Sequence, residues 1–123
     1  MQARTWPNRH RSEEAERYRR EGRWRDRTMA EGLAILMAER PDWVCLVDDA
    51  GRYSVTEIDR KARRLAGWFA RSGLSRGDVV AFQLPNWHET AVIALAASFL
   101  GLVCLPIVPI YRETELRFIL ADA

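Results

Sequence analysis

The stretch that decides the fold runs from residue 77 to residue 106 and reads GDVVAFQLPNWHETAVIALAASFLGLVCLP. Val79–Leu84 is too hydrophobic for a half-exposed strand, which predicts a strand that is buried on both faces. The helix expected from Trp87 to about Leu100 is apolar on nearly every side, and Leu102–Leu105 is a second apolar strand. A buried strand, a buried helix and a second buried strand predict a βαβ unit with parallel strands.

Capping signals indicate where the helices begin. Three places carry a Ser, Thr or Asn followed three residues later by Glu, so that each side chain can accept a hydrogen bond from the backbone of the other. They are Thr28 with Glu31, Ser54 with Glu57, and Asn86 with Glu89. Working outward, we expect helices over about residues 12–21, 28–40, 54–72 and 113–120, and a hairpin over residues 43–53.

The expected fold class is α/β, with mainly parallel strands, flanking helices and one β-hairpin. The composition agrees with a folded domain, because 48% of the 123 residues are hydrophobic and 29% are charged. With 19 basic against 17 acidic residues, the net charge is only +2. This balance argues against a general nucleic-acid-binding protein, which carries a strong basic excess.

An arginine-rich arm is expected over residues 1–27, where arginines alternate with acidic residues. Its segment Tyr18–Arg27 mixes arginines with aromatic rings, a combination also found in platforms for single-stranded nucleic acid. The alternative is an arm that lies along a larger body and is anchored by Tyr18 and Trp24. We favour this second interpretation and expect no nucleic-acid partner. The arm lacks the apolar run of a signal peptide, so the expected location is cytoplasmic.

Few residues of this sequence are candidates for catalysis, nucleotide binding or metal binding. The chain contains neither a glycine-rich phosphate loop nor a Gly-x-Ser-x-Gly nucleophile motif. Lys61 is its only lysine, and a solvated helix surface is the simpler interpretation of it. His10 lies in the arm and His88 in the first turn of a helix, and two distant histidines without a nearby cysteine predict no metal site. We interpret His88 as packing at the helix end, with an active-site role as the alternative.

Two further pairs of residues have structural interpretations. Asp48 and Asp49 could together hold Mg²⁺ or share a proton. Because Ala-Gly follows them, we expect the chemistry of a turn. Cys45 and Cys104 lie far apart in apolar runs, which predicts two reduced thiols in the core rather than a disulfide.

The span Ala91–Ile110 contains no charged residue over the length of a membrane crossing. Gly101, Pro106 and Pro109 interrupt it, so we expect a buried helix followed by a buried strand and no membrane span. A membrane-associated protein that uses Ala91–Ile110 stays as an alternative.

Several segments, taken in order, resemble the N-terminal region of the AMP-dependent, adenylate-forming synthetases and ligases. The likeness is greatest to acyl-CoA synthetases, of the kind represented by cyclohexanecarboxylate–CoA, medium-chain acyl–CoA and aryl–AMP ligases. The segments that carry it are residues 77–89 and 101–106, Tyr53–Asp59, Arg64–Ala66, Ile110–Leu116, and Tyr18, Gly22 and Trp24 in the arm.

The resemblance implies a reaction in two steps. A carboxylate attacks the α-phosphate of ATP to give an acyl-adenylate and pyrophosphate, and the thiol of coenzyme A then displaces AMP to form a thioester. The family's phosphate loop, adenylate-binding motif and catalytic lysine lie further along the chain than the part that this sequence resembles, and Lys61 does not match that lysine. We therefore assign no catalytic, cofactor-binding or metal residue to this chain.

The resemblance also implies a division of the chain. Residues 1–27 are the arm, and residues 28–123 are an incomplete N-terminal portion of an AMP-binding domain. ATP, Mg²⁺ and coenzyme A are implied for a full-length enzyme, and this chain is expected to bind none of them and to be inactive alone. Its expected partners are the rest of a synthetase or a second copy through exposed apolar surface. The alternative is a non-catalytic interaction module.

Overall fold

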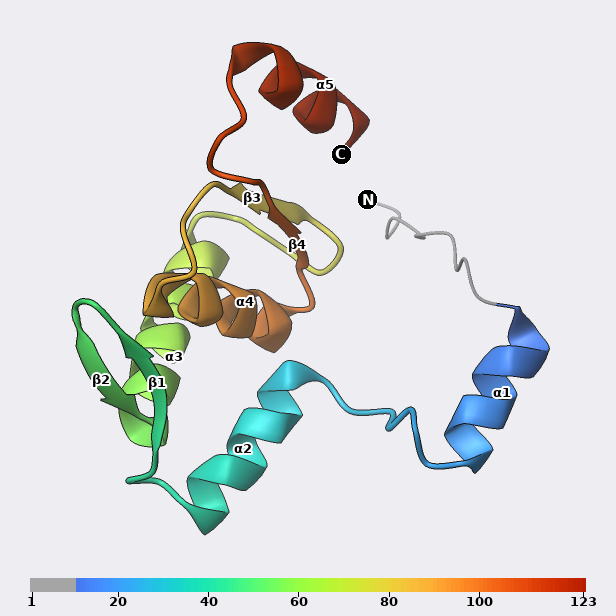
Figure 1. The fold of residues 1–123 in the computed structure, drawn as a ribbon, viewed down its shortest axis with the longest axis vertical. Coiled ribbons are helices and arrows are strands. Elements are labelled where there is room, and N and C mark those ends of the chain that lie inside the picture. The colour runs from blue at the N-terminus through green and yellow to red at the C-terminus, as the bar shows by residue number, and fades with distance from the viewer. Residues whose placement is uncertain (1–10) are drawn as a thin grey trace.

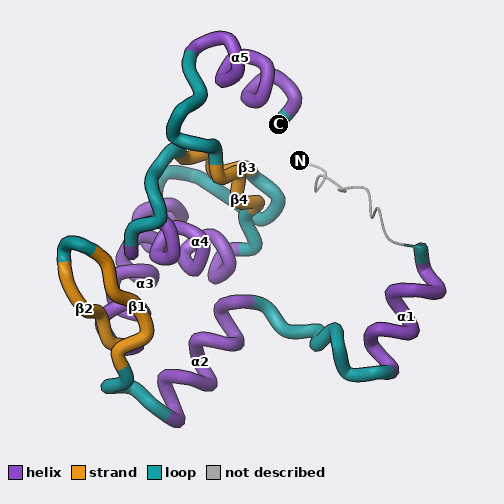
Figure 2. Tube along the Cα trace, in the orientation of Figure 1, coloured by secondary structure: helices purple, strands orange, loops and turns teal. Residues whose placement is uncertain are grey.

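A computed structural model describes residues 11–123, and Figures 1 and 2 show the course of its helices and strands. The helices are α1 (Ser12–Arg20), α2 (Met29–Glu39), α3 (Val55–Arg71), α4 (His88–Leu100) and α5 (Glu113–Asp122). The strands are β1 (Val44–Asp48), β2 (Gly51–Ser54), β3 (Val79–Phe82) and β4 (Val103–Pro106). The predicted α/β fold is confirmed.

The strands form two separate pairs. β1 and β2 make the predicted antiparallel hairpin, in which Asp48 lies opposite Gly51. β3 and β4 are parallel, with Val79 opposite Val103 and Phe82 opposite Pro106. The helix α4 connects them, because a parallel strand can be reached only by a connection that returns to the first end of the sheet. This is the predicted βαβ unit.

Two of the three predicted capping boxes are present. The Glu31 amide donates to the Thr28 hydroxyl at 3.2 Å, and the Thr28 amide donates to the Glu31 carboxylate at 2.6 Å. Ser54 and Glu57 make the same two hydrogen bonds at 3.3 and 2.8 Å. Each pair satisfies backbone N–H groups that the start of a helix leaves free, which fixes the beginnings of α2 and α3.

The third predicted capping pair, Asn86 with Glu89, is wrong. The cap residue of α4 is Trp87, whose side chain makes no capping hydrogen bond. The hairpin supplies the acceptor instead, since the His88 amide donates to Asp48 Oδ2 at 2.9 Å. A carboxylate is a stronger acceptor than a side-chain amide and is favoured at the positive end of a helix, so a distant residue takes the place of the local cap.

The helices α3 and α4 pack against each other at the centre of the core. One buried cluster contains Leu33, Val55, Ile58, Ala62, Val92 and Leu95, and a second contains Ala66, Phe69, Ala96, Ala97 and Leu102. Among residues 11–123, Val55 and Ile58 are the largest side chains that are fully buried. Burial of a side chain of this kind contributes roughly 1.5–3 kcal/mol, so α3 is the helix on which the fold depends most.

The βαβ unit is less buried than predicted. The residues of β3 and β4 are half-buried or exposed, and several residues of α4 are only half-buried. Val80 and Cys104 pack against the second core cluster on one face of the strand pair. On the other face, residues of α5 border a hollow over Val79, Val103 and Leu105. Burial on both faces needs two covering layers. Within residues 11–123, α3 and α4 cover part of one face, and α5 borders the other.

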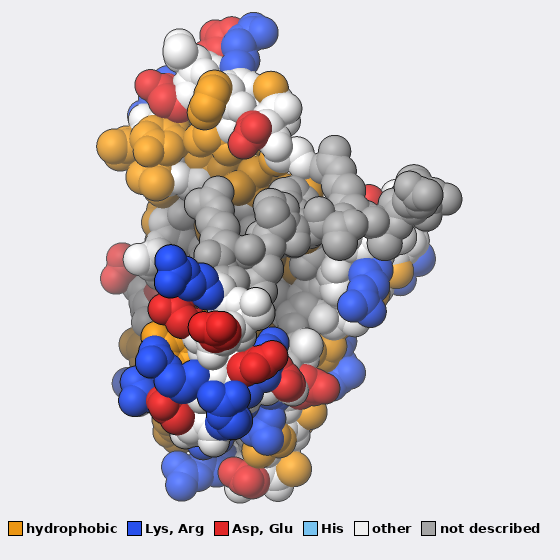
Figure 3. Space-filling model, turned by 90° about the vertical axis from the view of Figure 1, so that its right-hand side faces the viewer, with side chains coloured by type: hydrophobic (Ala, Val, Ile, Leu, Met, Phe, Trp, Pro, Cys, Tyr) orange, Lys and Arg blue, Asp and Glu red, His pale blue; other side chains and the backbone are white. Residues whose placement is uncertain are grey.

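Several large apolar side chains of α5 and of the segment before it lie in solvent. Phe118 is 77% exposed and Ile110 is 75% exposed, and about half of Val108 and of Leu120 is accessible. Figure 3 shows hydrophobic side chains gathered in the upper part of the molecule, where Figure 1 places α5. Gathered apolar surface of this kind is uncommon on soluble monomers.

Candidate functional site

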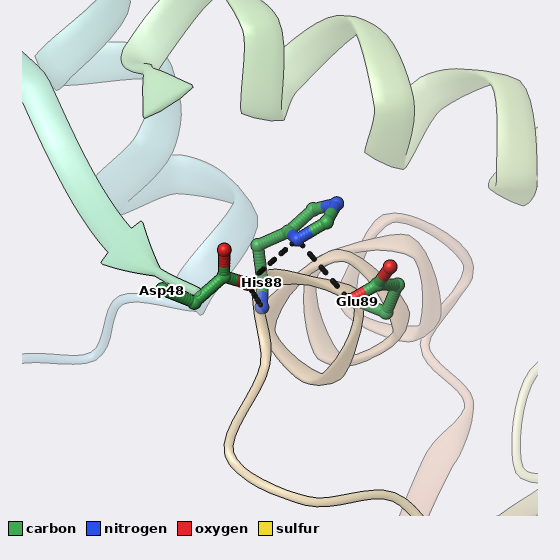
Figure 4. A group of neighbouring side chains, drawn as sticks. All are labelled: Asp48, His88 and Glu89. Carbon is green, nitrogen blue, oxygen red and sulfur yellow. Dashed lines mark hydrogen bonds and ion pairs between the residues drawn. The ribbon is translucent and has the colours of Figure 1, made fainter. Parts of the chain in front are cut away.

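Three polar side chains from different parts of the sequence meet beside the hairpin (Figure 4). Asp48 lies at the end of β1, and His88 and Glu89 open α4. The Nδ1 atom of His88 lies 2.8 Å from Asp48 Oδ2 and 3.1 Å from Glu89 Oε2. The side chains of His88 and Asp48 are 7% and 10% exposed, whereas Glu89 is 51% exposed. The histidine is therefore held between one buried carboxylate and one that faces solvent.

Asp48 accepts hydrogen bonds on both of its oxygens. Oδ1 accepts from the amides of Ala50 and Gly51 at 2.9 and 3.1 Å, which is the turn predicted from the sequence. Oδ2 accepts from the His88 amide at 2.9 Å. The amide and the ring of His88 lower the pKa of Asp48 to about 2, and the two turn amides add to this effect. Asp48 is thus an anion that joins the hairpin to α4.

The ring of His88 also has an aromatic neighbour. Tyr53 stacks on it with the ring centres 3.9 Å apart, and the Nζ atom of Lys61 lies 5.5 Å from the centre of the Tyr53 ring. Burial raises the pKa of Tyr53, and the negative charges of Asp48 and Glu89 raise it further. Lys61 is exposed on α3, as the sequence predicted, and its ammonium group faces the Tyr53 ring.

The cluster has the composition of a metal site but not the arrangement of one. The ligand atoms of Asp48, His88 and Glu89 lie within 4.8 Å of one another. However, Asp48 already accepts hydrogen bonds from three backbone amides. The start of α4 also carries the positive end of the helix dipole, which disfavours a cation. Mg²⁺ takes oxygen ligands, whereas one of these three side chains is a histidine and Asp48 already accepts three amide hydrogen bonds, so these residues do not fit the ion that the resemblance implies.

A hollow of about 380 Å³ opens beside the cluster. Asp48, Asp49 and Glu89 contribute three carboxylates to its wall, and Trp87 and Ala50 complete it. Negative side chains repel the phosphates of a nucleotide. The hollow is therefore not suited to ATP. The hydrogen bonds between Asp48 and His88 instead join the hairpin to α4.

The other residues singled out in the sequence lie apart from this cluster. Cys45 and Cys104 are free and half-buried, and burial raises the pKa of both thiols, so neither is an activated nucleophile. In the arm, the rings of Tyr18 and Trp24 lie 5.4 Å apart, and Arg19 pairs with Asp26. His10 lies outside the described residues.

The span Ala91–Ile110 contains most of α4 and all of β4, so the expected helix and strand are present, although both are less buried than expected. In the described part of the chain, no helix combines the length and the apolar character that a membrane crossing requires.

Sequence reasoning missed that Asp48 and His88 belong together. Each was interpreted correctly by itself, as a turn residue and as a residue packed at a helix end. Their contact joins positions 40 residues apart, and no spacing rule connects a hairpin turn with the start of a later helix. The one local signal was a pair of acidic residues immediately before Ala-Gly, at the tip of a predicted hairpin.

Comparison with known proteins identifies the family. Residues 34–123 match the family described as AMP-binding enzyme. The chain belongs to this family. Among curated relatives, the medium-chain fatty-acid–CoA ligase of Escherichia coli (strain K12) is 38% identical over 104 residues, which are 84% of this chain and 18% of that protein. The 2,3-dihydroxybenzoate-AMP ligase of Bacillus subtilis (strain 168) is 31% identical over 92% of this chain and 20% of its own length.

Solved structures of the family share the fold. The apo structure of MbtA from Mycobacterium smegmatis superimposes with a TM-score of 0.80 at 32% identity, over 91% of this chain and 21% of that one. The chain thus corresponds to the N-terminal part of adenylate-forming enzymes, as its sequence predicted. It spans about a fifth of the length of the curated relatives that it matches.

Proposed function

We propose that this chain forms the N-terminal scaffold of an acid–CoA ligase. In that enzyme a carboxylate oxygen attacks the α-phosphorus of ATP and pyrophosphate leaves. The sulfur of coenzyme A then attacks the acyl carbon of the adenylate, and AMP leaves. The observation that carries the proposal is the 38% identity to the E. coli medium-chain fatty-acid–CoA ligase over 84% of this chain. A medium-chain acid, a place in fatty acid metabolism and a cytoplasmic location are parts of the same proposal.

We further propose that the chain is inactive alone. Phosphoryl chemistry needs positive groups and backbone donors around the phosphates. The sequence has no glycine-rich phosphate loop, and the hollow beside His88 is acidic. ATP, Mg²⁺ and coenzyme A would be held by the region that the relatives have beyond the matched portion.

Exchange of labelled pyrophosphate into ATP tests this proposal. The purified chain is incubated with ATP, Mg²⁺ and either medium-chain or aromatic carboxylic acids, and the E. coli ligase serves as the positive control. We expect no acid-dependent exchange by the chain alone. Clear exchange with any of the acids would show that the catalytic parts are present.

The exposed apolar side chains around α5 favour a second candidate function, a non-catalytic module that binds another protein. The two candidates differ in one respect. A scaffold restores catalysis when it is joined to the rest of a synthetase, whereas an independent module does not.

A further inference from the structure

The solvent-facing side of α3 carries a stripe of basic residues with a tryptophan among them. At 3.6 residues per turn, five exposed side chains fall within about 100° of the helix circumference. They form what we call the basic stripe: Arg60, Lys61, Arg64, Trp68 and Arg71. At 1.5 Å per residue, the stripe is about 17 Å long. The buried residues of the helix, such as Ile58 and Phe69, lie on the opposite side.

The positive charge of the basic stripe is not balanced by neighbouring acids. α3 contains five basic and two acidic residues, a net charge of +3, whereas the whole chain is at +2. Asp59 pairs with Arg63 at 2.7 Å, outside the stripe. The carboxylate of Glu57 turns back to the start of the helix, where it accepts from the Ser54 amide at 2.8 Å. In the part of the chain that the structure describes, no ion pair includes a cation of the stripe.

Trp68 lies in the middle of the basic stripe. It follows Arg64 by about one turn and precedes Arg71 by about one turn, and it is 56% exposed. An indole combines an apolar body with a polar N–H group, which suits the boundary between water and the hydrocarbon of a membrane. An arginine guanidinium is planar and can bind two phosphate oxygens at once. The stripe thus combines side chains that favour phosphate groups with one that favours a bilayer interface.

We infer that the basic stripe binds the surface of an anionic lipid bilayer. The headgroup phosphates contact the arginines and Lys61, and Trp68 enters the headgroup layer. The apolar side of α3 stays in the protein core, so the helix lies on the bilayer and does not insert into it. Each Lys or Arg near an anionic membrane strengthens binding about fivefold, so four of them give a weak association that depends on salt.

Nucleic acid or an acidic protein fits the basic stripe less well. Proteins that bind single strands hold the backbone in a positively charged groove, whereas the stripe lies on the convex side of one helix. The residues outside α3 carry a net charge of −1, so they add no basic excess for a long polyanion. An acidic protein needs carboxylates spaced to match the arginines. A bilayer presents phosphates along the whole stripe.

Flotation with lipid vesicles tests the inference in the 123-residue chain. Vesicles of phosphatidylcholine, with or without phosphatidylglycerol, are mixed with the chain and floated through a density gradient, in which aggregated chain sinks. We expect the chain to float with the anionic vesicles at about 0.05 M salt and to be released at about 0.5 M salt, because salt screens the charges. Equal flotation with both kinds of vesicle, or with neither, would overturn the inference.

Two double variants with the same change of charge locate the contact. Arg60→Gln with Arg64→Gln should weaken partitioning to anionic vesicles by about 25-fold, at about fivefold for each arginine. Arg25→Gln with Arg27→Gln removes the same charge from the arm and should change partitioning by less than about twofold. All four positions are exposed, and a urea midpoint equal to that of the wild type shows that each variant is folded. A larger loss in the arm variant would overturn the inference.

Tryptophan fluorescence gives a second readout. We expect the emission of the wild-type chain to shift to shorter wavelength on anionic vesicles, because Trp68 leaves water for the headgroup layer. The shift should be lost in Trp68→Phe and kept in Trp43→Phe, which replaces a similarly exposed indole before β1. The reverse result would place the hairpin rather than α3 on the bilayer and would overturn the inference.

Two further outcomes would also overturn it. A chain that binds single-stranded DNA or polyglutamate through Arg60 and Arg64, and does not float, would assign the stripe to a nucleic acid or an acidic protein. If the free chain floats but a chimera in which it replaces the matched portion of the E. coli ligase does not, the remainder of the enzyme covers the stripe. None of these readouts is enzymatic, so flotation and pyrophosphate exchange can fail independently.

Discussion

Asp48 connects two elements that are distant in the sequence, the hairpin and α4. Its carboxylate closes the turn of the hairpin through Ala50 and Gly51, and it caps α4 through the amide of His88. A charged acceptor at the start of a helix also interacts favourably with the helix dipole. One side chain thus joins the turn of the hairpin to the start of α4, beside the apolar contacts that Cys45, Leu46 and Tyr53 make with the core.

Asp48→Asn should make the stability depend less on pH. The pKa of Asp48 is lowered to about 2 in the folded chain, whereas an unfolded aspartate titrates near about 3.9. The charged form therefore stabilises the fold fully above about pH 4, and this contribution is lost as the pH falls through about 2. We expect the wild-type chain to have the higher urea midpoint at pH 6, with the difference shrinking towards pH 2.

Asp49→Asn is the matched control for this measurement. Asp49 is the neighbouring exposed carboxylate, and it has no hydrogen bond to His88. Its variant should follow the wild-type midpoint at every pH. A difference between wild type and Asp48→Asn that stays constant from pH 6 to pH 2 would mean that the charge of Asp48 does not stabilise the fold.

At the scale of elements, α3 carries the largest share of the packing. Ile58 lies in the middle of the first core cluster and is 1% exposed. Ile58→Ala should lower the free energy of unfolding by about 2–5 kcal/mol, because it removes buried methyl groups and leaves a cavity. Arg60→Ala, two residues further along and exposed, should change it by no more than about 0.5 kcal/mol. Urea denaturation of both variants measures these changes. Similar losses of unfolding free energy in the two variants would mean that Ile58 does not contribute to the core.

The elements that could be predicted from the sequence are those with local signals. Thr28 with Glu31 and Ser54 with Glu57 mark the starts of α2 and α3, because both partners of each capping box lie within one turn. The parallel pairing of β3 and β4 followed from the order of apolar segments. The cap of α4 was wrong, since tertiary structure brought Asp48 to a position where Asn86 was the local candidate.

Burial and the candidate site could not be predicted in the same way. The hydrophobicity of Val79–Leu84 indicated full burial. The structure buries this strand only in part, because the other elements of residues 11–123 do not cover both of its faces. The Asp48–His88 contact depends on how the hairpin docks on α4, which no periodicity encodes. Sequence patterns thus predicted the elements, and the packing between them had to come from the structure.

For the whole molecule, the exposed apolar surface around α5 should lead to self-association of the purified chain. Phe118 and Ile110 are its most exposed large side chains. We expect sedimentation at increasing concentration to give an average mass above that of the monomer. Phe118→Ser combined with Ile110→Ser should shift the mass towards the monomer, because the patch loses its apolar area.

Phe118→Leu is the control for this association, because it keeps the surface apolar and should leave the average mass unchanged. A monomer at all concentrations that melts sharply and reversibly would mean that the surface is too small to drive association.

Pyrophosphate exchange tests most directly whether these 123 residues are the scaffold portion of an acid-activating ligase. It is measured with a medium-chain fatty acid in a chimera in which this chain replaces the matched portion of the E. coli ligase. We predict acid-dependent exchange by the chimera and none by either this chain alone or the ligase without its matched portion. A chimera that unfolds cooperatively like the parent ligase and yet gives no exchange would contradict the claim.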